Sequence, residues 1–364
     1  MPQAKLSDPS GRGKAEGFKV IFPMMQHPYT EAEIQAVVDV MRNAEGQTQG
    51  KYLEKFEKDF AAFVGAKYAF GVNNCTNALK LAAIFCHIQP GDEVIVPEPC
   101  FVCYAPLTTL AGGVPVSLPL KAENGFRLTA DELRQAITPR TKALVLAFPN
   151  NPTGAVMEKA DLEAVADVLR GTDIAVISDE IYAELTYEGR HTSIAALDGM
   201  RERTIVVGGF SKSHAMTGWR LGYLLAPSEL TAQMFKIHQY GIMCAPTTSQ
   251  FAAVDALANG DADVEEMKNE YDCRRRLILD GLAACGIECF PPKGAFYVFP
   301  NIGAFGLSSE EFCTRLIDEE NVALVPGSAF GESGEGFARV SYAYSVRHIE
   351  KALERIGRFV QRLR

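Results

Sequence analysis

The most informative stretch of this sequence is GFSKSHAMTGWR at residues 209–220. The stretch follows an apolar run at residues 204–207, which has the composition of a buried strand. Another apolar run, at residues 174–177, ends shortly before Asp179. A polar residue in that place is expected at the carboxyl end of a strand, where open α/β sheets bind their ligands. The sequence therefore indicates that Lys212 and Asp179 belong to one ligand site.

Five polar side chains in this part of the chain match the requirements of one cofactor, pyridoxal phosphate. The cofactor needs an amine to hold its aldehyde as a Schiff base, a carboxylate to keep its ring nitrogen protonated, and cations for its phosphate. Lys212 supplies the amine, Asp179 the carboxylate, and Arg220 a planar guanidinium that suits a phosphate. Tyr182 and Asn151 supply neutral donors for the phenolate oxygen of the ring, which lowers the pKa of the Schiff-base nitrogen.

Four stretches of the sequence resemble the class I/II aminotransferase family, part of the aspartate aminotransferase superfamily of fold-type I pyridoxal phosphate-dependent enzymes. They are SKSHAMTGWRLGY at residues 211–223, FPNNPTG at 148–154, KIHQYGIMCAP at 236–246 and PGSAFG at 326–331. The similarity covers residues 65–360 and is greatest to the branch that holds N-acetyl-diaminopimelate and aromatic aminotransferases. It implies an α/β fold in which helices sandwich a mainly parallel seven-stranded sheet, with a smaller α+β domain beside it.

The resemblance assigns cofactor roles to individual residues. It implies that Lys212 is the Schiff-base lysine and moves the α-proton of the substrate, with Asp179 and Tyr182 as the other catalytic residues. The residues that it implies for cofactor binding are Cys75, Thr76, Asn77, Phe101, Asn151, Asp179, Tyr182, Ser211, Lys212 and Arg220. Within this set, Phe101 is expected to stack on the cofactor ring, and Ser211 and Arg220 to bind the phosphate.

The resemblance also implies how the substrate is bound. Arg339, in FARVSYA at residues 337–343, matches an arginine that holds the α-carboxylate of the substrate in two parallel hydrogen bonds, and Asn151 is the second substrate-binding residue. Such a clamp fixes which bond of the substrate stands perpendicular to the cofactor ring and so selects the bond that breaks. It favours an α-amino acid over a nucleotide-sugar ketone, which has no carboxylate for this arginine to bind at that position.

Two stretches depart from the usual pattern of the family. In NNCTNAL, at residues 73–79, Cys75 replaces a glycine of the phosphate-binding turn, although the helix that follows can still direct its backbone amides to a phosphate. The front of the chain lacks the usual Gly-x-Pro element. Its sequences FPMMQHPYTEAEI, at 22–34, and QTQGKYLEKFE, at 47–57, resemble sugar aminotransferases of the same fold type.

Two reactions are compatible with these residues. The first is transfer of the α-amino group of an amino acid to a 2-oxo acid through a Schiff base on Lys212. The alternative is β- or γ-elimination, replacement or carbon–carbon bond formation, because the same scaffold hosts all of these reactions. The sequence leaves open which amino acid and which acceptor are used.

Composition sets further limits on location and partners. The 364 residues carry 36 Lys and Arg against 45 Asp and Glu, a net charge of -9, which argues against a surface for nucleic acid or for an anionic membrane. No apolar run approaches the ~20 residues of a membrane span. Nine cysteines, an odd number, are typical of reduced thiols, and the pair Cys100 and Cys103 has no second pair at zinc spacing. We expect a cytoplasmic protein without a metal site, and the family resemblance implies that it is a homodimer.

The pattern of apolar residues predicts the order of the elements. Residues 1–18 are expected to form a flexible arm, residues 54–260 the large cofactor-binding domain, and residues 19–53 with 261–364 the small domain. Strands are predicted at residues 68–72, 93–96, 143–148, 174–178, 204–207 and 221–226. Helices are predicted at residues 30–41, 54–64, 77–87, 160–170, 264–285, 310–320 and 346–363, and a short strand pair is expected among the last three.

Overall fold

The computed structural model describes residues 31–43, 51–85 and 88–364. Its strands are β1 (Phe70–Val72), β2 (Glu93–Glu98), β3 (Val114–Pro119), β4 (Thr141–Ala147), β5 (Ala175–Asp179), β6 (Thr204–Gly209), β7 (Gly222–Leu225), β8 (Tyr297–Val298), β9 (Val325–Pro326) and β10 (Ala338–Ser341). Its α-helices are α1 (Glu31–Asn43), α2 (Lys51–Phe63), α3 (Cys75–Phe85), α4 (Tyr104–Leu110), α5 (Ala130–Ala136), α6 (Lys159–Leu169), α7 (Phe210–Ser213), α8 (Ser228–Gly241), α9 (Thr247–Asn259), α10 (Asp261–Ala284), α11 (Ser309–Glu320) and α12 (Val346–Leu363). The predicted arm, residues 1–18, lies outside the described residues.

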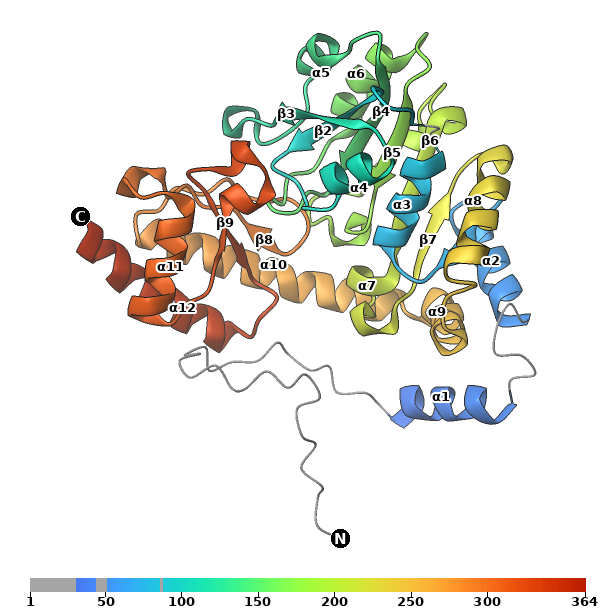
Figure 1. Ribbon diagram of the computed structural model, residues 1–364. Helices are drawn as coiled ribbons and strands as arrows, with labels where there is room; N and C mark the ends of the chain where they lie inside the picture. The colour runs from blue at the N-terminus through green and yellow to red at the C-terminus, as the bar shows by residue number, and fades with distance from the viewer. Residues whose placement is uncertain (1–30, 44–50, 86–87) are drawn as a thin grey trace, which may run out of the picture.

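A seven-stranded sheet forms the centre of the molecule, as Figure 1 shows. Its strands stand in the order β1-β7-β6-β5-β4-β2-β3. The pairs from β3 through β2, β4 and β5 to β6 are parallel, whereas β7 is antiparallel to both of its neighbours. This arrangement confirms the predicted mainly parallel sheet.

Apolar side chains cover both faces of the sheet because successive residues of a strand point to opposite sides. In β2, Ile95 packs into a core with α5 and α6, while Val94 and Val96 pack into a second core with α3, α4 and α8. Continuous apolar runs such as those of β4 and β5 are expected where a parallel sheet is buried on both faces. The helices therefore sandwich the sheet and leave the ends of its strands for a site.

Strand β3 was not predicted from the sequence. Its residues Val114–Pro119 include prolines at 115 and 119, and proline lowers the expectation of a strand because it lacks a backbone N–H. In the structure β3 pairs only with β2 and stands at the edge of the sheet, where a missing N–H costs no ladder hydrogen bond. The tertiary position thus explains a strand that the local sequence disfavours.

A second, three-stranded sheet with the order β8-β10-β9 lies near the carboxyl terminus. Helices α10, α11 and α12 pack on it through a core that includes Ile278, Phe312, Val340 and Phe359. The predicted strand pair is in fact a set of three, because the two-residue strand β9 adds to the far side of β10. In the front part of the chain, α1 and α2 both contact α9. The division into residues 54–260 and 19–53 with 261–364 stays a prediction.

No helix among the described residues is long and apolar enough to cross a membrane. The same residues contain no group of three side chains arranged to hold a metal ion.

Candidate active site

The predicted site residues come from strands that end at one edge of the large sheet. Strand β5 ends at Asp179, β4 is followed by the turn that contains Asn151, and β6 leads directly into α7, which carries Lys212. Because these strands are parallel neighbours, their carboxyl ends lie side by side. The antiparallel strand β7 begins at the same edge, just after Arg220.

Asp179 forms the floor of this site and is 5% exposed. Its carboxylate accepts hydrogen bonds from the Tyr104 hydroxyl at 2.9 Å and from the Ile181 backbone N–H at 3.1 Å. The Cys75 thiol lies 3.5 Å from each carboxylate oxygen. Burial raises the pKa of Asp179 above its ordinary 3.8, although these hydrogen bonds act in the opposite direction. A cation beside this carboxylate would offset the cost of burying its charge.

The amine of Lys212 lies in largely aromatic surroundings. Its Nζ is 6.0 Å from the centre of the Tyr182 ring and 5.7 Å from that of Phe296. Burial, with smaller contributions from the charges of Arg339 and Arg220, lowers the pKa of Lys212 below 10.5. A larger fraction of this amine is therefore neutral and nucleophilic than for a lysine at the surface.

Arg339, on β10, reaches from the small sheet into the same site. Its Nη1 donates a hydrogen bond to the Asn151 side-chain oxygen at 2.9 Å. Its guanidinium carbon lies 4.6 Å from the centre of the Tyr297 ring and 4.8 Å from that of Phe330, so both rings contact it. The Nε atom of Arg339 is buried and has no hydrogen-bond partner among the described residues. An unpaired buried N–H on a cation is a position where an anionic ligand can bind.

The predicted phosphate residues lie near the start of α3 and near α7. Cys75, Thr76 and Asn77 form the first turn of α3, in which the Asn77 backbone N–H is capped by the Asn74 side chain at 2.9 Å. The Cys75 thiol is directed to Asp179. Gly222 allows β7 to approach this turn, because a Cβ there would lie 2.9 Å from the Cys75 backbone nitrogen.

Two further predicted phosphate ligands are near Lys212. Ser211 is the residue before it in α7 and accepts a hydrogen bond from the Thr217 hydroxyl through its carbonyl oxygen, at 2.7 Å. Arg220 has a left-handed backbone, with φ 59°, a conformation that is uncommon for residues other than glycine and is typical of functional sites. Its Nη1 donates to the Thr217 carbonyl at 2.7 Å, which leaves the rest of an exposed guanidinium available.

Phe101 lies in the segment between β2 and α4 and is 38% exposed. Phe101 makes no ring contact with another aromatic side chain of the described residues, so its stacking on a cofactor stays a prediction. Sequence reasoning missed four aromatic residues of the site, Tyr104, Phe296, Tyr297 and Phe330. Tyr104 follows Phe101 closely and begins α4, and Phe330 belongs to the quoted stretch at 326–331, so local signals for both were present. Tyr297 had no such signal.

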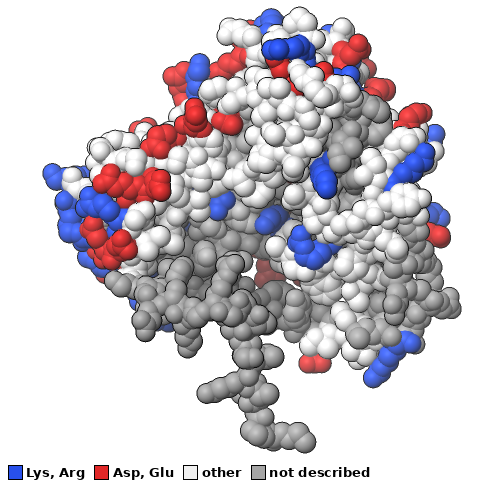
Figure 2. All heavy atoms as spheres, in the orientation of Figure 1, with Lys and Arg blue, Asp and Glu red and all other residues white. Residues whose placement is uncertain are grey.

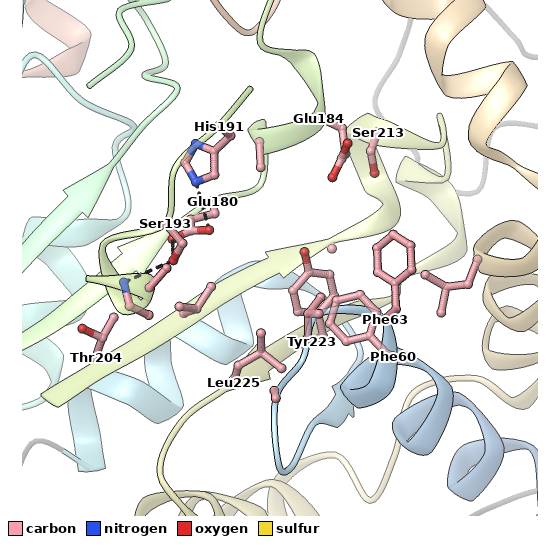
Figure 3. A pocket seen from close by; sticks show the side chains of 18 of the residues that line it. Phe60, Phe63, Glu180, Glu184, His191, Ser193, Thr204, Ser213, Tyr223 and Leu225 are labelled. Atoms are coloured by element: carbon pink, nitrogen blue, oxygen red, sulfur yellow. Dashed lines mark hydrogen bonds and ion pairs between the residues drawn. The ribbon is translucent and has the colours of Figure 1, made fainter. Parts of the chain in front are cut away.

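A separate cavity of the described residues lies elsewhere. It has a volume of about 920 Å³, and its lining includes none of Lys212, Asp179, Tyr182, Asn151 and Arg339. Figure 3 shows Phe60 and Phe63 of α2 on one side of it, with Glu180, His191 and Ser193 on the other. Glu180 accepts a 2.6 Å hydrogen bond from Ser193 and contacts His191 at 3.0 Å. These contacts fasten the loop after β5 and are separate from the candidate active site.

The side chains at the sheet edge fit pyridoxal phosphate by their chemistry. They include an amine with a lowered pKa, a buried carboxylate with a raised pKa, and a half-buried arginine whose buried Nε is unpaired. Comparison with known proteins agrees with this fit, because the family described as "Aminotransferase class I and II" matches residues 26–356.

The chain belongs to the class I and II aminotransferases.

Several relatives of this aminotransferase are closely similar along most of the chain. It is 52% identical over 280 residues to a putative aminotransferase of Bacillus subtilis, covering 77% of this chain and 72% of the relative. It is 45% identical to aromatic-amino-acid aminotransferase 2 of Thermococcus litoralis, covering 85% and 80%. Among solved structures, the aromatic aminotransferase of Pyrococcus horikoshii superposes with a TM-score of 0.87 and 40% identity, covering 92% of this chain and 93% of that one.

These similarities establish the reaction class. The enzyme is a pyridoxal phosphate-dependent transferase that moves an amino group between an amino acid and a 2-oxo acid. They give no support to the alternative of elimination, replacement or carbon–carbon bond formation. The prediction of an α/β fold of type I is confirmed by the same comparisons.

Proposed function

We propose that this aminotransferase binds pyridoxal phosphate at the edge formed by β4, β5 and β6, with Lys212 as the residue that binds its aldehyde. When bound, the cofactor accepts into its ring the electron pair that is released at the α-carbon of the substrate. The observation that carries the proposal is the convergence of Lys212, Asp179 and Arg339 on one site from two different sheets. Asp179 would bind the ring nitrogen, and Tyr182 with Asn151 the phenolate oxygen.

Asp179 has the properties needed to keep a proton on the ring nitrogen. Its carboxylate is buried, and burial raises its pKa, so its negative charge is stabilised when a positive group lies against it. Tyr104 and the Ile181 N–H hold the carboxylate in place with hydrogen bonds of 2.9 Å and 3.1 Å. A carboxylate that is fixed in this way needs little reorganisation during the reaction.

Lys212 is proposed to remove the proton from the α-carbon of the substrate once its Nζ is free. The lowered pKa of this amine favours the neutral form, which is the form that acts as a base. The rings of Tyr182 and Phe296 lie beside the nitrogen of this half-buried side chain and reduce the space open to water there.

The phosphate is proposed to bind between the first turn of α3 and the segment from Ser211 to Arg220. Thr76 and Arg220 are both exposed at this edge. The amino-terminal end of α3 adds the positive end of a helix dipole. On the face in Figure 2, several Lys and Arg side chains lie along the upper edge of a central hollow, and most Asp and Glu side chains lie away from it, an arrangement that suits anionic ligands.

Arg339 and Asn151 are proposed to bind the α-carboxylate of the amino acid. The unpaired Nε and the hydrogen bond from Nη1 to Asn151 leave the guanidinium in a fixed plane that a carboxylate can approach with two oxygens. The same pair would bind the carboxylate of the 2-oxo acid in the second half of the reaction. Fixing this group sets the α-hydrogen toward Lys212, so that binding also determines the reaction.

Reductive labelling tests the assignment of Lys212. Borohydride treatment of the cofactor-loaded enzyme, followed by peptide mapping, should place a pyridoxyl group on Lys212. Lys293, which pairs with Glu158 and Glu188 at the surface, should stay unlabelled and serves as the internal control. A label on any other lysine would contradict the proposed site.

A panel of amino acids without an acceptor tests the substrate class and the alternative chemistry. We expect conversion of the cofactor to pyridoxamine phosphate together with a matching 2-oxo acid. The aromatic amino acids belong in the panel because a relative carries that specificity in its name. Loss of a side-chain fragment, or a new carbon–carbon bond to an added electrophile, would favour elimination, replacement or bond formation.

We also propose a cytoplasmic homodimer. Apolar side chains at the end of α8 and after it are exposed, with Tyr240 at 92% and Met243 at 52%, as is Val102 at 51% beside the site. Such side chains are typical of a surface that a second copy covers. Cysteines throughout the described residues are free thiols, as in a reducing compartment. Sedimentation at the mass of one 39.7 kDa chain with full activity, or recovery outside the cytosolic fraction, would contradict the respective part of this proposal.

A further inference from the structure

Tyr297, at the start of β8, contacts both the residue proposed to bind the cofactor oxygen and the residue proposed to bind the substrate. Its hydroxyl lies 3.0 Å from the hydroxyl of Tyr182, within hydrogen-bond distance. The face of its ring lies 4.6 Å from the guanidinium carbon of Arg339. It is 7% exposed and packs edge-on against the Tyr182 ring at 5.9 Å. These two contacts are made by two different parts of one side chain.

Backbone contacts hold the segment that carries Tyr297 against the turn that carries Asn151. The backbone N–H groups of Lys293 and Gly294 both donate to the Gly154 carbonyl at 3.0 Å. Gly154 has φ +70°, and a Cβ there would lie 2.9 Å from the Gly294 carbonyl oxygen, so a larger residue would push the two segments apart. On the other side, β8 pairs with β10, which brings Tyr297 opposite Ser341 and close to Arg339. Its position is thus fixed from both sheets.

We propose that Tyr297 is a positioning residue with two separable actions, in which its hydroxyl orients and polarises Tyr182 while its ring holds the guanidinium of Arg339 in the plane that a carboxylate requires. The proposal rests on the cofactor and substrate roles given above for Tyr182 and Arg339. It makes Tyr297 a link between cofactor binding and substrate binding in this aminotransferase.

The hydroxyl action follows from the number of protons available. If Tyr182 donates its single proton to the cofactor, its oxygen is free to accept one from Tyr297. Burial raises the pKa of Tyr297, so that its proton is retained at neutral pH. A hydroxyl that accepts one hydrogen bond becomes a stronger donor in the next. Tyr297 would therefore strengthen the hydrogen bond that Tyr182 would donate to the phenolate oxygen, which would lower the pKa of the Lys212 Nζ in its Schiff base.

The ring action follows from the geometry around Arg339. Tyr297 and Phe330 contact the guanidinium at 4.6 Å and 4.8 Å, and Asn151 accepts from one of its ends. A planar cation that contacts two aromatic rings and donates one hydrogen bond loses little rotational freedom when a carboxylate binds, because it is already held in place. Loss of one face would let the guanidinium tilt and weaken the two parallel hydrogen bonds to the substrate.

Two substitutions in the cofactor-loaded enzyme separate these actions. Tyr297→Phe removes the hydroxyl and keeps the ring. It should raise the pH at which the absorbance of the lysine-bound cofactor titrates by about 0.5–1 unit, the effect of roughly one hydrogen bond, and change the KM for the best amino acid of the panel by less than about twofold. Tyr297→Leu removes both parts and should also raise that KM about three- to thirtyfold.

Tyr271→Phe is the matched control, because it removes a hydroxyl from a ring that packs on the same Phe296 at 5.4 Å. It should leave both the titration and KM at the wild-type values. Thermal melting and cofactor content check that each variant is folded and loaded. Should Tyr297→Leu not fold, Tyr297→Met takes its place, because it keeps more of the buried volume.

An unchanged titration in Tyr297→Phe, or an equal rise of KM in Tyr297→Phe and Tyr297→Leu, would overturn the proposal. So would equal changes in Tyr271→Phe, which would indicate a general effect of packing. Failure of the proposed function is recognised separately in the wild-type enzyme, by a borohydride label away from Lys212 or by the absence of amino-group transfer. If the wild-type enzyme passes both tests, a negative result with the variants contradicts the proposed role of Tyr297 alone.

Discussion

The active site holds two opposite charges that the protein stabilises in different ways. We call the Asp179 carboxylate the floor of the site and the Arg339 guanidinium its wall. The floor is the carboxylate of Asp179, which accepts hydrogen bonds from Tyr104, Cys75 and the Ile181 backbone at the edge of the large sheet. The wall is the guanidinium of Arg339, which contacts the rings of Tyr297 and Phe330 and donates to Asn151. Asp179 and Arg339 do not form an ion pair with each other.

The difference shows which charge depends on a ligand. Burial raises the pKa of Asp179, so the floor is at its most favourable when a cationic ring lies against it. Aromatic faces stabilise the cation of the wall without neutralising it, and its Nε stays unpaired and available for a carboxylate. The floor is therefore expected to govern the chemical step, whereas the wall is expected to govern substrate affinity.

The largest expected effect is loss of the floor charge. Asp179→Asn should lower kcat by about 10³-fold or more, because the ring nitrogen is no longer kept protonated, and should change KM little. Steady-state kinetics on enzyme with full cofactor content measure both constants. Glu184→Gln, at an exposed carboxylate on the same loop, is the control and should behave as wild type. Near-normal turnover of a fully loaded Asp179→Asn enzyme would contradict the proposal that the floor governs the chemical step.

A change in the wall should have the reverse pattern. Arg339→Lys keeps the positive charge and loses the planar pair of donors, so KM should rise by about 10²-fold with a smaller fall in kcat. The matched control is Arg347→Lys, at an exposed position beyond β10, with no expected change in either constant. If kcat fell while KM stayed constant, the wall would have a role in the chemical step.

A smaller effect is expected from the hydrogen bond that supports the floor. Tyr104→Phe removes the 2.9 Å bond to Asp179 and keeps the ring in its buried position. Loss of about one hydrogen bond to a charged group predicts a fall in kcat of roughly tenfold. Cys75→Ser keeps a donor in the place of the thiol and should lie within about threefold of wild type. A larger fall in kcat for Cys75→Ser than for Tyr104→Phe would contradict the expectation that Tyr104 contributes more than Cys75 to holding the Asp179 carboxylate.

The smallest expected effect concerns stability of the protein without cofactor. Because burial raises the pKa of Asp179 in the folded state, the unfolded chain loses this proton first as pH rises from 3.8, and stability falls through that range. Asp179→Asn should remove this loss and stabilise the cofactor-free protein at pH 8 by on the order of 1 kcal/mol. Urea unfolding of both proteins across pH measures it. Stabilisation that is equal at all pH values would have a cause other than this charge.

Much of the floor was predictable because it depends on short-range order in the sequence. An apolar run of strand length followed by a polar residue places Asp179 and the segment with Lys212 at strand ends, and parallel pairing then brings those ends together. The quoted stretches at 148–154 and 211–223 are local in the same sense. Once the order of the strands is known, the residues of these two stretches can be predicted to lie in one site.

The wall was less predictable because it depends on contacts between distant parts of the chain. Arg339 and Asn151 are 188 positions apart, and Tyr297 and Tyr182 are 115 positions apart. No periodicity at Tyr297 distinguishes it from a core tyrosine, and no signal directs the Cys75 thiol to Asp179 instead of a phosphate. The proline-containing strand β3 was missed for a related reason, since only its place at the edge of the sheet makes it possible.

The sequence by itself therefore determined the residues that stand at the strand ends, which follow from local pattern, the cofactor, which follows from residue chemistry, and the fold type, which the resemblance of four short stretches to a known family implied. Only the tertiary structure decided which aromatic rings hold Arg339, which hydroxyls support Asp179 and Tyr182, and where the prolines of β3 are tolerated. These depend on how two sheets are packed against each other. Packing brings together side chains whose separation along the chain carries no information about their distance in space.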